Sequence, residues 1–304
     1  MDFTLNDDQA TLATALDGLA ARFETKPTDF HGFALASAAL DQELEEGGFF
    51  DIASVPDLGP LSAALAVERL ARLPYAAEIA LSMLVRPQLT GEWPRPFGLI
   101  ENGRSGRFVA QAKTLLLIEG RKIAVLQPSP DLLEPVDSIY AYPMGRLKRD
   151  GEAKPLSDEE TAKIRTWLRV ALAAEASGLL HAAIASTVEH ISVRKQFGRP
   201  LGTFQALRHR LAECTVMAGG VRLLALKAAW SGNAGEAAMA AYHAQESATR
   251  VVYDVHQMLG AMGMTLEHPL HLWTYRLKAL LGELGGRGGQ AESVARHCFG
   301  EASV

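Results

Sequence analysis

The stretch Arg194-Lys-Gln-Phe-Gly-Arg-Pro-Leu-Gly-Thr-Phe-Gln-Ala-Leu-Arg-His209 carries the most information in this chain. It lies between two long segments with apolar residues at helical spacing, so it predicts a helix–loop–helix corner. Arginine offers a planar fork for phosphate, and a helix N-terminus offers free N–H groups to an anion. Aromatic faces and a glutamine amide can hold a flat, hydrogen-bonding ring. Together these groups suit the pyrophosphate of a dinucleotide.

Composition and charge limit the kind of protein this can be. The chain has 304 residues, of which 48% are hydrophobic and 21% charged, as in globular proteins with a sizeable core. The net charge of −5, without any basic block, argues against a nucleic-acid partner. The acidic start Met1-Asp-Phe-Thr-Leu-Asn-Asp-Asp8 predicts no secretory signal, and no apolar run reaches the roughly 20 residues that span a bilayer. Cys214 and Cys298 lie far apart, which predicts free thiols in a reducing cytoplasm.

Three segments with different patterns follow one another along the chain. Residues 1–90 predict an N-terminal helical domain, with a helix-start signal at Asn6–Gln9. Residues 91–150 are richer in proline and glycine, carry short β-prone runs and predict a small antiparallel β-domain. Residues 151–304 are again helical and predict a C-terminal four-helix bundle with short connections.

Local signals place the elements within these segments. Ser157 and Glu160 form a capping-box pattern at the start of the first bundle helix, after a linker over 149–157. Glu119–Lys122 predicts a hairpin turn. Further helices are expected over 40–50, 61–72, 75–85, about 203–231, 235–259 and 268–282, and strands over 108–110, 115–118, 123–126 and 138–142.

Two motifs resemble the acyl-CoA dehydrogenase family. The Arg194 stretch is similar to that family's R-x-Q-F-G-x-x-x-x-x-F-Q signature, and His256–Leu270 is similar to its Q-x-x-G-G-x-G-x-T-x-E-x-P segment, with Ala261 in place of the second glycine. The resemblance covers nearly the whole chain. It implies a mainly α fold with N-terminal helices, a reduced antiparallel β-domain and a C-terminal four-helix bundle.

The resemblance also implies a cofactor, FAD, shared at a subunit interface. In this family the bundle of a neighbouring subunit holds the dinucleotide tail of FAD. The alternative is that these residues only pin a helix corner and a helix end. The implied contacts to the pyrophosphate and adenine are Arg194, Gln196, Phe197, Phe204, Gln205, Gln257, Gly260 and Ala261.

The base that the resemblance requires is missing from its expected positions. The family removes an α-proton with a carboxylate, usually a Glu followed by Gly, and transfers a β-hydride to FAD. Counting from Arg276 places Gly285-Gly286 there, and glycine cannot abstract a proton. The other position that the family uses corresponds to Leu168. Glu283 and Glu175 are weak candidates, since a solvated helix carboxylate explains each of them as well.

These departures suggest a subunit that completes a partner's site. The β-domain is about half the length that the family uses, and the family's Thr-Ser-Gln after the base is replaced by Arg287-Gly-Gly289. We therefore expect the non-base subunit of a heteromeric, FAD-dependent acyl-CoA dehydrogenase, a heterotetramer of the steroid-catabolism type. Its partners would be a homologous subunit, an acyl-CoA and an electron-transfer flavoprotein. The alternatives are a self-sufficient homo-oligomeric enzyme that uses Glu283, and a flavin-free scaffold.

A metal site is not expected. His268 and His271 lie close in sequence near Glu267, but their spacing is not a zinc pattern and no cysteine is near. Histidines at a helix start explain them.

Overall fold

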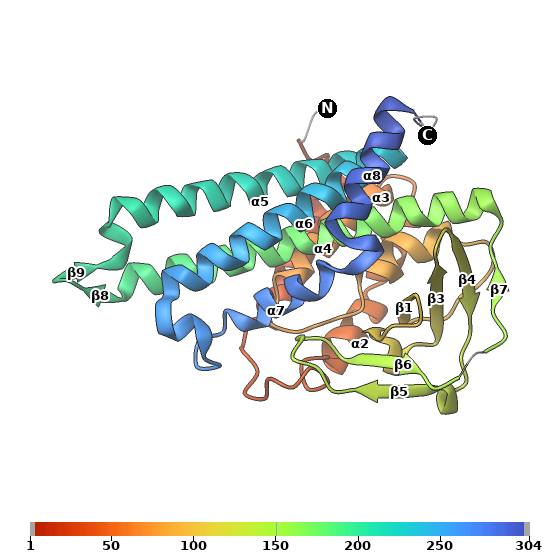
Figure 1. The fold of residues 1–304 in the computed structure, drawn as a ribbon, viewed down its shortest axis with the longest axis horizontal. Helices are drawn as coiled ribbons and strands as arrows, with labels where there is room; N and C mark the ends of the chain where they lie inside the picture. Colours follow the sequence, from red (N-terminus) through yellow and green to blue (C-terminus); the bar gives the residue numbers. More distant parts are fainter. Residues whose placement is uncertain (1–3, 150, 301–304) are drawn as a thin grey trace.

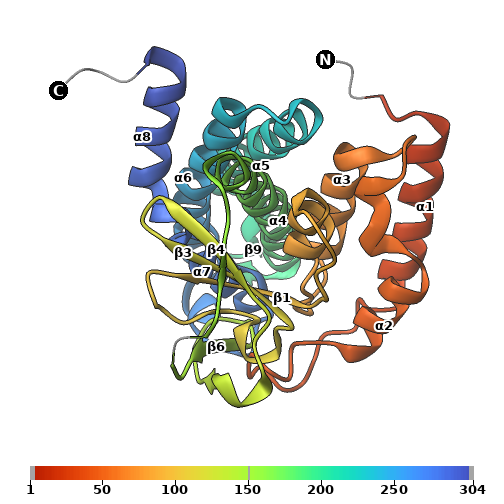
Figure 2. The ribbon, with the colours of Figure 1, turned by 90° about the vertical axis from the view of Figure 1, so that its right-hand side faces the viewer.

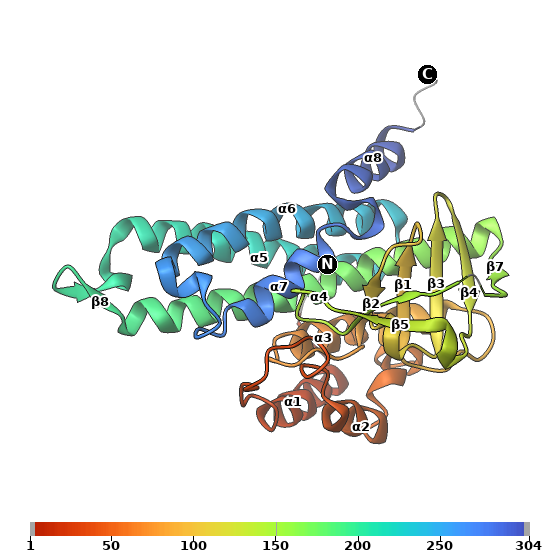
Figure 3. The same ribbon diagram turned by 60° about the horizontal axis from the view of Figure 1, so that its bottom comes forward.

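The computed structural model describes residues 4–149 and 151–300, so residues 1–3, 150 and 301–304 of the expected segments lie outside the described part. Long helices form a bundle, with a small β-region at one end and a short hairpin at the other (Figure 1). The N-terminal helices α1 (Asp7–Ala21), α2 (Ala38–Glu46) and α3 (Gly59–Ala71) lie along one side of the bundle (Figure 2). The β-region lies beside them, against the first half of the longest helix (Figure 3).

The N-terminal helices begin where their capping residues predict. The Asn6 side chain accepts a hydrogen bond from the Gln9 N–H, and the Gln9 side chain returns one to Asn6, which confirms the start of α1. Ser37 caps α2, and Gly47 ends it, after which Phe49–Ser54 form a 3₁₀ helix. The predicted helix over 75–85 is wrong in its first half. The backbone at Ala76 pairs with Leu35 and Ala36, and only Leu81–Val85 is helical, as a π-helix (η2).

Two small sheets make up the β-region. Strands β1 (Phe97–Glu101), β3 (Thr114–Glu119), β4 (Lys122–Leu126) and β7 (Lys154–Pro155) pair in the order β1-β3-β4-β7. Strands β2 (Gly106–Arg107), β6 (Met144–Leu147) and β5 (Leu133–Val136) pair in the order β2-β6-β5. The predicted hairpin is confirmed, since Glu119 pairs with Lys122 across the β3–β4 turn.

Three expectations for the β-region need correction. The sheet is not purely antiparallel, because β1 and β3 run parallel, with β2 and a 3₁₀ turn crossing between them. Residues 108–110 are no strand, since Phe108 adopts φ +59° and starts the 3₁₀ turn Val109–Gln111. Residues 138–142 are also no strand. Tyr142 is buried and packs on Phe108 and Met144, whereas Ile139 is 76% exposed.

The bundle is built around α4 (Asp158–Val193), which starts at the predicted Ser157–Glu160 capping box. By length and composition α4 could cross a membrane, but 83% of its most apolar window is buried inside the protein, as in a core helix. Helices α5 (Gln205–Ser231), α6 (Ala234–Leu259) and α7 (His271–Leu280) pack with it and confirm the predicted helices. α4 and α3 approach closely at Gly178, where an added Cβ would lie 2.2 Å from the Glu68 carbonyl oxygen.

A further helix, α8 (Gly286–Phe299), was not predicted, because its glycine-rich start is typical of a loop. Tertiary contacts stabilise it instead. The buried Gln290 amide donates to the Leu284 carbonyl (3.0 Å) and accepts from Arg169 Nε (2.8 Å), while the helix packs on α6. Its C-terminal end points away from the rest of the molecule (Figure 3).

Candidate functional site

The corner after α4 forms a short hairpin that projects from the end of the bundle (Figure 1). Strands β8 (Lys195–Gln196) and β9 (Arg199–Pro200) are joined by Phe197 (φ +53°) and Gly198 (φ +80°), a two-residue turn with both φ values positive. The Phe197 side chain is 86% exposed. An aromatic ring held at the tip of a hairpin, without contact to its own core, is placed to bind another molecule.

The remaining residues of this corner surround the hairpin base. Arg194, Gln196 and Gln205 are exposed, and the guanidinium of Arg199 lies 4.2 Å from the centre of the Phe204 ring. Phe204 also contacts Phe197 edge to face, with ring centres 6.0 Å apart. No side chain caps the start of α5, so N–H groups of its first turn are free for an anion. This group of exposed cations, amides and aromatic rings suits a dinucleotide.

A pocket of about 640 Å³ lies between the end of α6 and α7. Gln257, Gly260 and Ala261, which sequence predicted, line it. So do residues that sequence reasoning missed, among them Tyr253 and Lys278. Tyr253 lies one helical turn before Gln257 on the same helix, and this spacing could have predicted that it lines the pocket. Lys278 belongs to α7, and no sequence pattern links it to Gln257. No lining residue is acidic, so the pocket can accept a phosphate.

Glycine is required at only one position of the Gly260-Ala261 pair. Gly260 adopts φ +60° and ψ −135°, a conformation open essentially to glycine alone. Ala261 follows in a 3₁₀ turn (η7, Gly260–Met264) and has no positive φ, so its methyl group causes no backbone strain. His256 holds this turn, with Nδ1 2.6 Å from the Gly263 carbonyl oxygen and Nε2 2.9 Å from Thr274 Oγ1.

The hairpin and the C-terminal end of α6, whose residues line the pocket, lie toward the same end of the bundle (Figure 1). The His190 ring at the end of α4 contacts the His268 ring before α7, with centres 5.0 Å apart, and so links the two regions. None of Arg194, Gln196, Phe197, Phe204 and Gln205 lines the pocket. The structure therefore brings together the two halves of the predicted site at one end of the molecule, as neighbouring surfaces.

The two histidines near Glu267 have structural contacts. His271 Nδ1 lies 2.8 Å from the His268 carbonyl oxygen, and the Leu270 N–H donates to His268 Nδ1 (3.2 Å). Burial, with His190 nearby, lowers the pKa of His268 to about 4. Within residues 4–149 and 151–300, no group of three His, Cys, Asp or Glu side chains is arranged to hold a metal.

Glu283 and Glu175, the weak candidates for a base, both face Arg107. Arg107 Nε and Nη2 donate to the Glu283 carboxylate at 2.6 and 3.0 Å. Its Nη1 donates to the two oxygens of Glu175 at 3.1 and 2.9 Å, and the Tyr142 hydroxyl donates to Glu175 at 2.5 Å. The side chains of Arg107, Glu175 and Glu283 are only 8%, 4% and 18% exposed. The expected base positions hold no carboxylate: Leu168 is buried, and Gly285 lies in the turn before α8.

These groups lie where the β-region meets α4 and the turn before α8, a junction that we call the cleft. The cavity left between Ala77–Leu81, Leu99, Phe108 and the Arg107–Glu175 pair is about 10 Å³, no more than one water molecule requires. Burial disfavours a charged Arg107, but Glu175 and Glu283 raise its pKa well above the usual value. Burial and Glu175 raise the pKa of Tyr142, which therefore stays a neutral donor.

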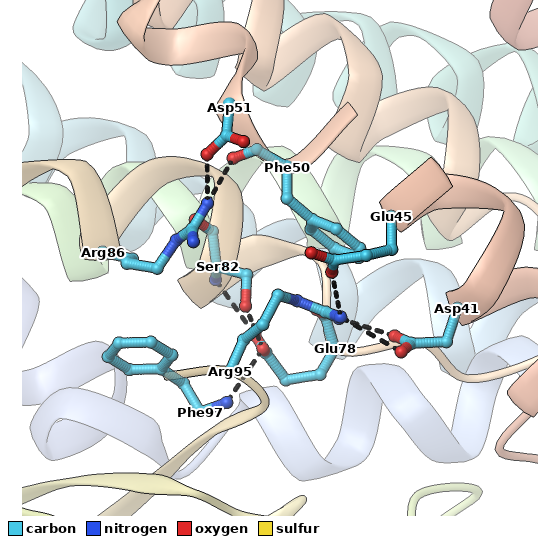
Figure 4. A network of polar contacts seen from close by, with 9 residues as sticks. All are labelled: Asp41, Glu45, Phe50, Asp51, Glu78, Ser82, Arg86, Arg95 and Phe97. Atoms are coloured by element: carbon cyan, nitrogen blue, oxygen red, sulfur yellow. Dashed lines mark hydrogen bonds and ion pairs between the residues drawn. The ribbon is translucent and has the colours of Figure 1, made fainter. Parts of the chain in front are cut away.

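Another buried carboxyl group, that of Glu78, lines this cavity and belongs to a separate polar network (Figure 4). Glu78 is 4% exposed and accepts hydrogen bonds from the Phe97 N–H (2.9 Å), the Ser82 N–H (3.1 Å) and the Ser82 hydroxyl. Arg95 lies beside it and binds Asp41 and Glu45 on α2, with its guanidinium 3.3 Å from the centre of the Phe50 ring. Burial raises the pKa of Glu78 to about 7.

Comparison with known proteins identifies the fold and the bundle. Residues 163–298 match the sequence profile of the family described as acyl-CoA dehydrogenase, C-terminal domain. The chain superimposes on the glutaryl-coenzyme A dehydrogenase–glutaryl-CoA complex with a TM-score of 0.77, over 97% of this chain and 96% of that one, at 19% identity. The chain has the acyl-CoA dehydrogenase fold. The ChsE4-ChsE5 complex from Mycobacterium tuberculosis gives a TM-score of 0.78 at 19% identity and covers 100% of both chains.

Several curated proteins that match part of the chain are named acyl-CoA dehydrogenases. IpdE2 of Mycobacterium tuberculosis, an acyl-CoA dehydrogenase, is 34% identical over 190 residues, which is 55% of this chain and 59% of that protein. FadE28 of the same organism is 26% identical over 63% of this chain and 60% of its own length. FadE34 matches over 52% of this chain but 23% of its own length. The chain thus matches 60% or less of the length of these relatives.

Proposed function

We propose that this chain is the non-base subunit of a heteromeric, FAD-dependent acyl-CoA dehydrogenase. One contrast carries the proposal. The residues suited to a dinucleotide are exposed at the end of the bundle, whereas the cavity beside Arg107 and Glu175 is only about 10 Å³. The chain can therefore complete a site in a neighbour, whereas Glu175, one of its two weak base candidates, borders little space for a substrate.

The residues present fit the tail of FAD. Exposed Arg194 and the free start of α5 suit the pyrophosphate, and exposed Phe197 and Gln196 suit a flat ring. The pocket with Gln257 and Gly260 has the size of a small-molecule site and no acidic lining. Bound FAD supplies the hydride acceptor. In the proposal the partner subunit supplies the carboxylate base and the flavin-ring pocket, and this chain orients the dinucleotide.

The relatives support the type of enzyme. FadE28, FadE34 and IpdE2 are acyl-CoA dehydrogenases by name, and the ChsE4-ChsE5 complex joins two different chains. The Tcur3481-Tcur3483 steroid acyl-CoA dehydrogenase also shares the fold, with a TM-score of 0.79 at 20% identity. We infer a heterotetramer that dehydrogenates a bulky, ring-bearing acyl-CoA in the cytoplasm and passes its electrons to an electron-transfer flavoprotein.

Co-expression with a homologous subunit that carries the Glu base tests the proposal. We expect flavin absorbance near one per heterodimer in the complex and none in this chain alone. Arg194→Ala should lower the flavin content of the complex, because the pyrophosphate loses a charge-assisted contact. Arg104→Ala, at an exposed arginine outside both motifs, is the matched control and should leave the flavin content unchanged.

Other outcomes would favour the alternatives. Stoichiometric flavin and dehydrogenation by the lone chain would support a self-sufficient enzyme and overturn the proposal. Equal flavin content in the Arg194→Ala complex and the unsubstituted complex would show that Arg194 does not help to bind the dinucleotide. A complex that forms without any flavin would indicate a scaffold.

A further inference from the structure

Arg107 lies where the three parts of the chain meet. It comes from the β-region, Glu175 comes from the middle of α4, and Glu283 comes from the turn between α7 and α8. Arg107 makes four hydrogen bonds to the two carboxylates, so its planar fork is used on both edges. A single cation thus ties the β-region to two separate elements of the bundle.

A second buried arginine extends this cluster to the N-terminal helices. Arg276 is 3% exposed and donates to the carbonyl oxygens of Leu73 (2.6 Å) and Tyr75 (2.8 Å) after α3, and of Leu272 on its own helix (2.6 Å). Glu175 and Tyr142 are among the charged or polar groups that act on its charge. Arg107 and Arg276 together balance Glu175 and Glu283, so the buried cluster carries no excess charge.

We infer that Arg107 seals the cleft of this chain, with Glu175 and Glu283 serving as its counter-ions rather than as proton acceptors. The inference rests on the proposed function, in which the partner carries the base. The seal keeps an acyl chain and a flavin ring away from Glu175, because the cavity of about 10 Å³ beside it admits neither. It also holds the Glu283 carboxylate by one hydrogen bond to each oxygen.

Thiol labelling of the lone chain tests the seal without any activity measurement. Ala80 is buried and lines the remaining cavity, so Ala80→Cys places a probe there, in a Cys298→Ser background that removes the exposed thiol. With the network intact, we expect labelling at least tenfold slower than in the denatured chain. Arg107→Ala combined with Glu175→Gln and Glu283→Gln removes the plug together with both of its counter-ions, while Arg276 keeps its three backbone carbonyl acceptors. This triple variant should accelerate labelling at least tenfold.

A milder variant covers the case in which the triple variant does not fold. Arg107→Lys keeps the charge but cannot bridge both carboxylates, and should give an intermediate labelling rate. Labelling that is equally slow in Arg107→Lys and in the unsubstituted network, or equally slow in a folded triple variant, would overturn the inference. Fast labelling of the unsubstituted network would overturn it as well.

The reconstituted complex separates this inference from the proposed function. Glu283→Gln should leave kcat of the complex within about twofold, whereas removal of a general base lowers rates by about 10²–10⁴-fold. A large loss of kcat in Glu283→Gln would make Glu283 the base and overturn both proposals. If the complex binds no flavin but labelling of the lone chain is slow and Arg107-dependent, the seal stands and only the proposed function fails.

Discussion

Two buried ionisable side chains, Arg107 and Glu78, differ in whether a group of opposite charge binds them. Arg107 keeps its charge because two carboxylates surround it, whereas Glu78 has no cation bound directly to its carboxyl group. Glu78 instead accepts hydrogen bonds from two backbone N–H groups and a hydroxyl (Figure 4). The nearby Arg95 guanidinium donates to Asp41 and Glu45 rather than to the Glu78 carboxyl group. Burial therefore dominates, and Glu78 titrates near neutral pH.

Glu78 should make the stability of the chain fall as pH rises toward neutrality. Its pKa is about 7 in the folded state against 4.5 for an ordinary Glu, so the folded chain holds a proton that the unfolded chain has released. The contribution of this proton to the free energy of unfolding is fully present below pH 4.5 and is lost as the pH rises to 7. For this difference in pKa the change is about 3 kcal/mol. Urea unfolding between pH 4.5 and 8 measures it.

Glu78→Gln should flatten this pH dependence, because the amide does not titrate. The variant should also be less stable at pH 5 by about 1–3 kcal/mol, since an amide N–H₂ then faces a backbone donor. Glu45→Gln, at an exposed carboxylate of the same network, serves as the control and should retain the pH dependence. An unchanged slope in Glu78→Gln would refute the assignment.

At the scale of elements, local capping fixes where helices start, and one glycine fixes how two of them pack. The α3–α4 crossing has no room for a side chain at position 178, where a Cβ would lie 2.2 Å from the Glu68 carbonyl and 2.8 Å from the Ala71 Cβ. A Cβ added at Gly219 on α5 would have no other heavy atom within 4 Å. Gly178 is thus required for the close packing of α3 and α4, whereas Gly219 is not required for packing.

Gly178→Ala should destabilise the chain by about 1–3 kcal/mol or more, because backbone must move to accept the methyl group. Gly219→Ala should stabilise it by about 1 kcal/mol through helix propensity. The free energy of unfolding in urea distinguishes the two. Equal effects of the same sign would show that the close approach of α3 and α4 is not real.

At the scale of the whole molecule, one face of the bundle is apolar and uncovered. Val216, Leu223 and Trp230 are spaced by seven residues on α5 and are 75%, 45% and 64% exposed. Such a stripe on a long helix is typical of a surface that another helix buries. Together with the projecting hairpin, this stripe gives the proposed heteromer a surface on which a partner can pack.

Val216→Glu should weaken assembly, because it places a charge in the centre of the stripe. We expect a lower mass in light scattering of the purified complex, or of the lone chain if it self-associates. Ile139→Glu, at an apolar residue of the β-region that is 76% exposed, is the control and should leave the mass unchanged. An unaltered mass in Val216→Glu would exclude this face from the interface.

The sequence by itself determined the local features of this protein. Asn6, Ser157 and the Glu119–Lys122 turn predicted where α1, α4 and the β3–β4 hairpin begin, because capping and turn formation depend on neighbours a few residues away. The two motifs predicted the acyl-CoA dehydrogenase fold, since their residues occur in order and at fixed spacing. The dinucleotide role of these residues stays a prediction.

Only the tertiary structure decided what depends on distant residues. The parallel pairing of β1 with β3, the extended segment at Ala76 and the glycine-started α8 arise from contacts between segments that local patterns do not encode. The same holds for the cleft. Glu283 and Glu175 lie far apart in sequence from Arg107, and no periodicity in the chain indicates that one guanidinium binds both. Burial makes this ion pair necessary for stability, because charged groups removed from water must be paired.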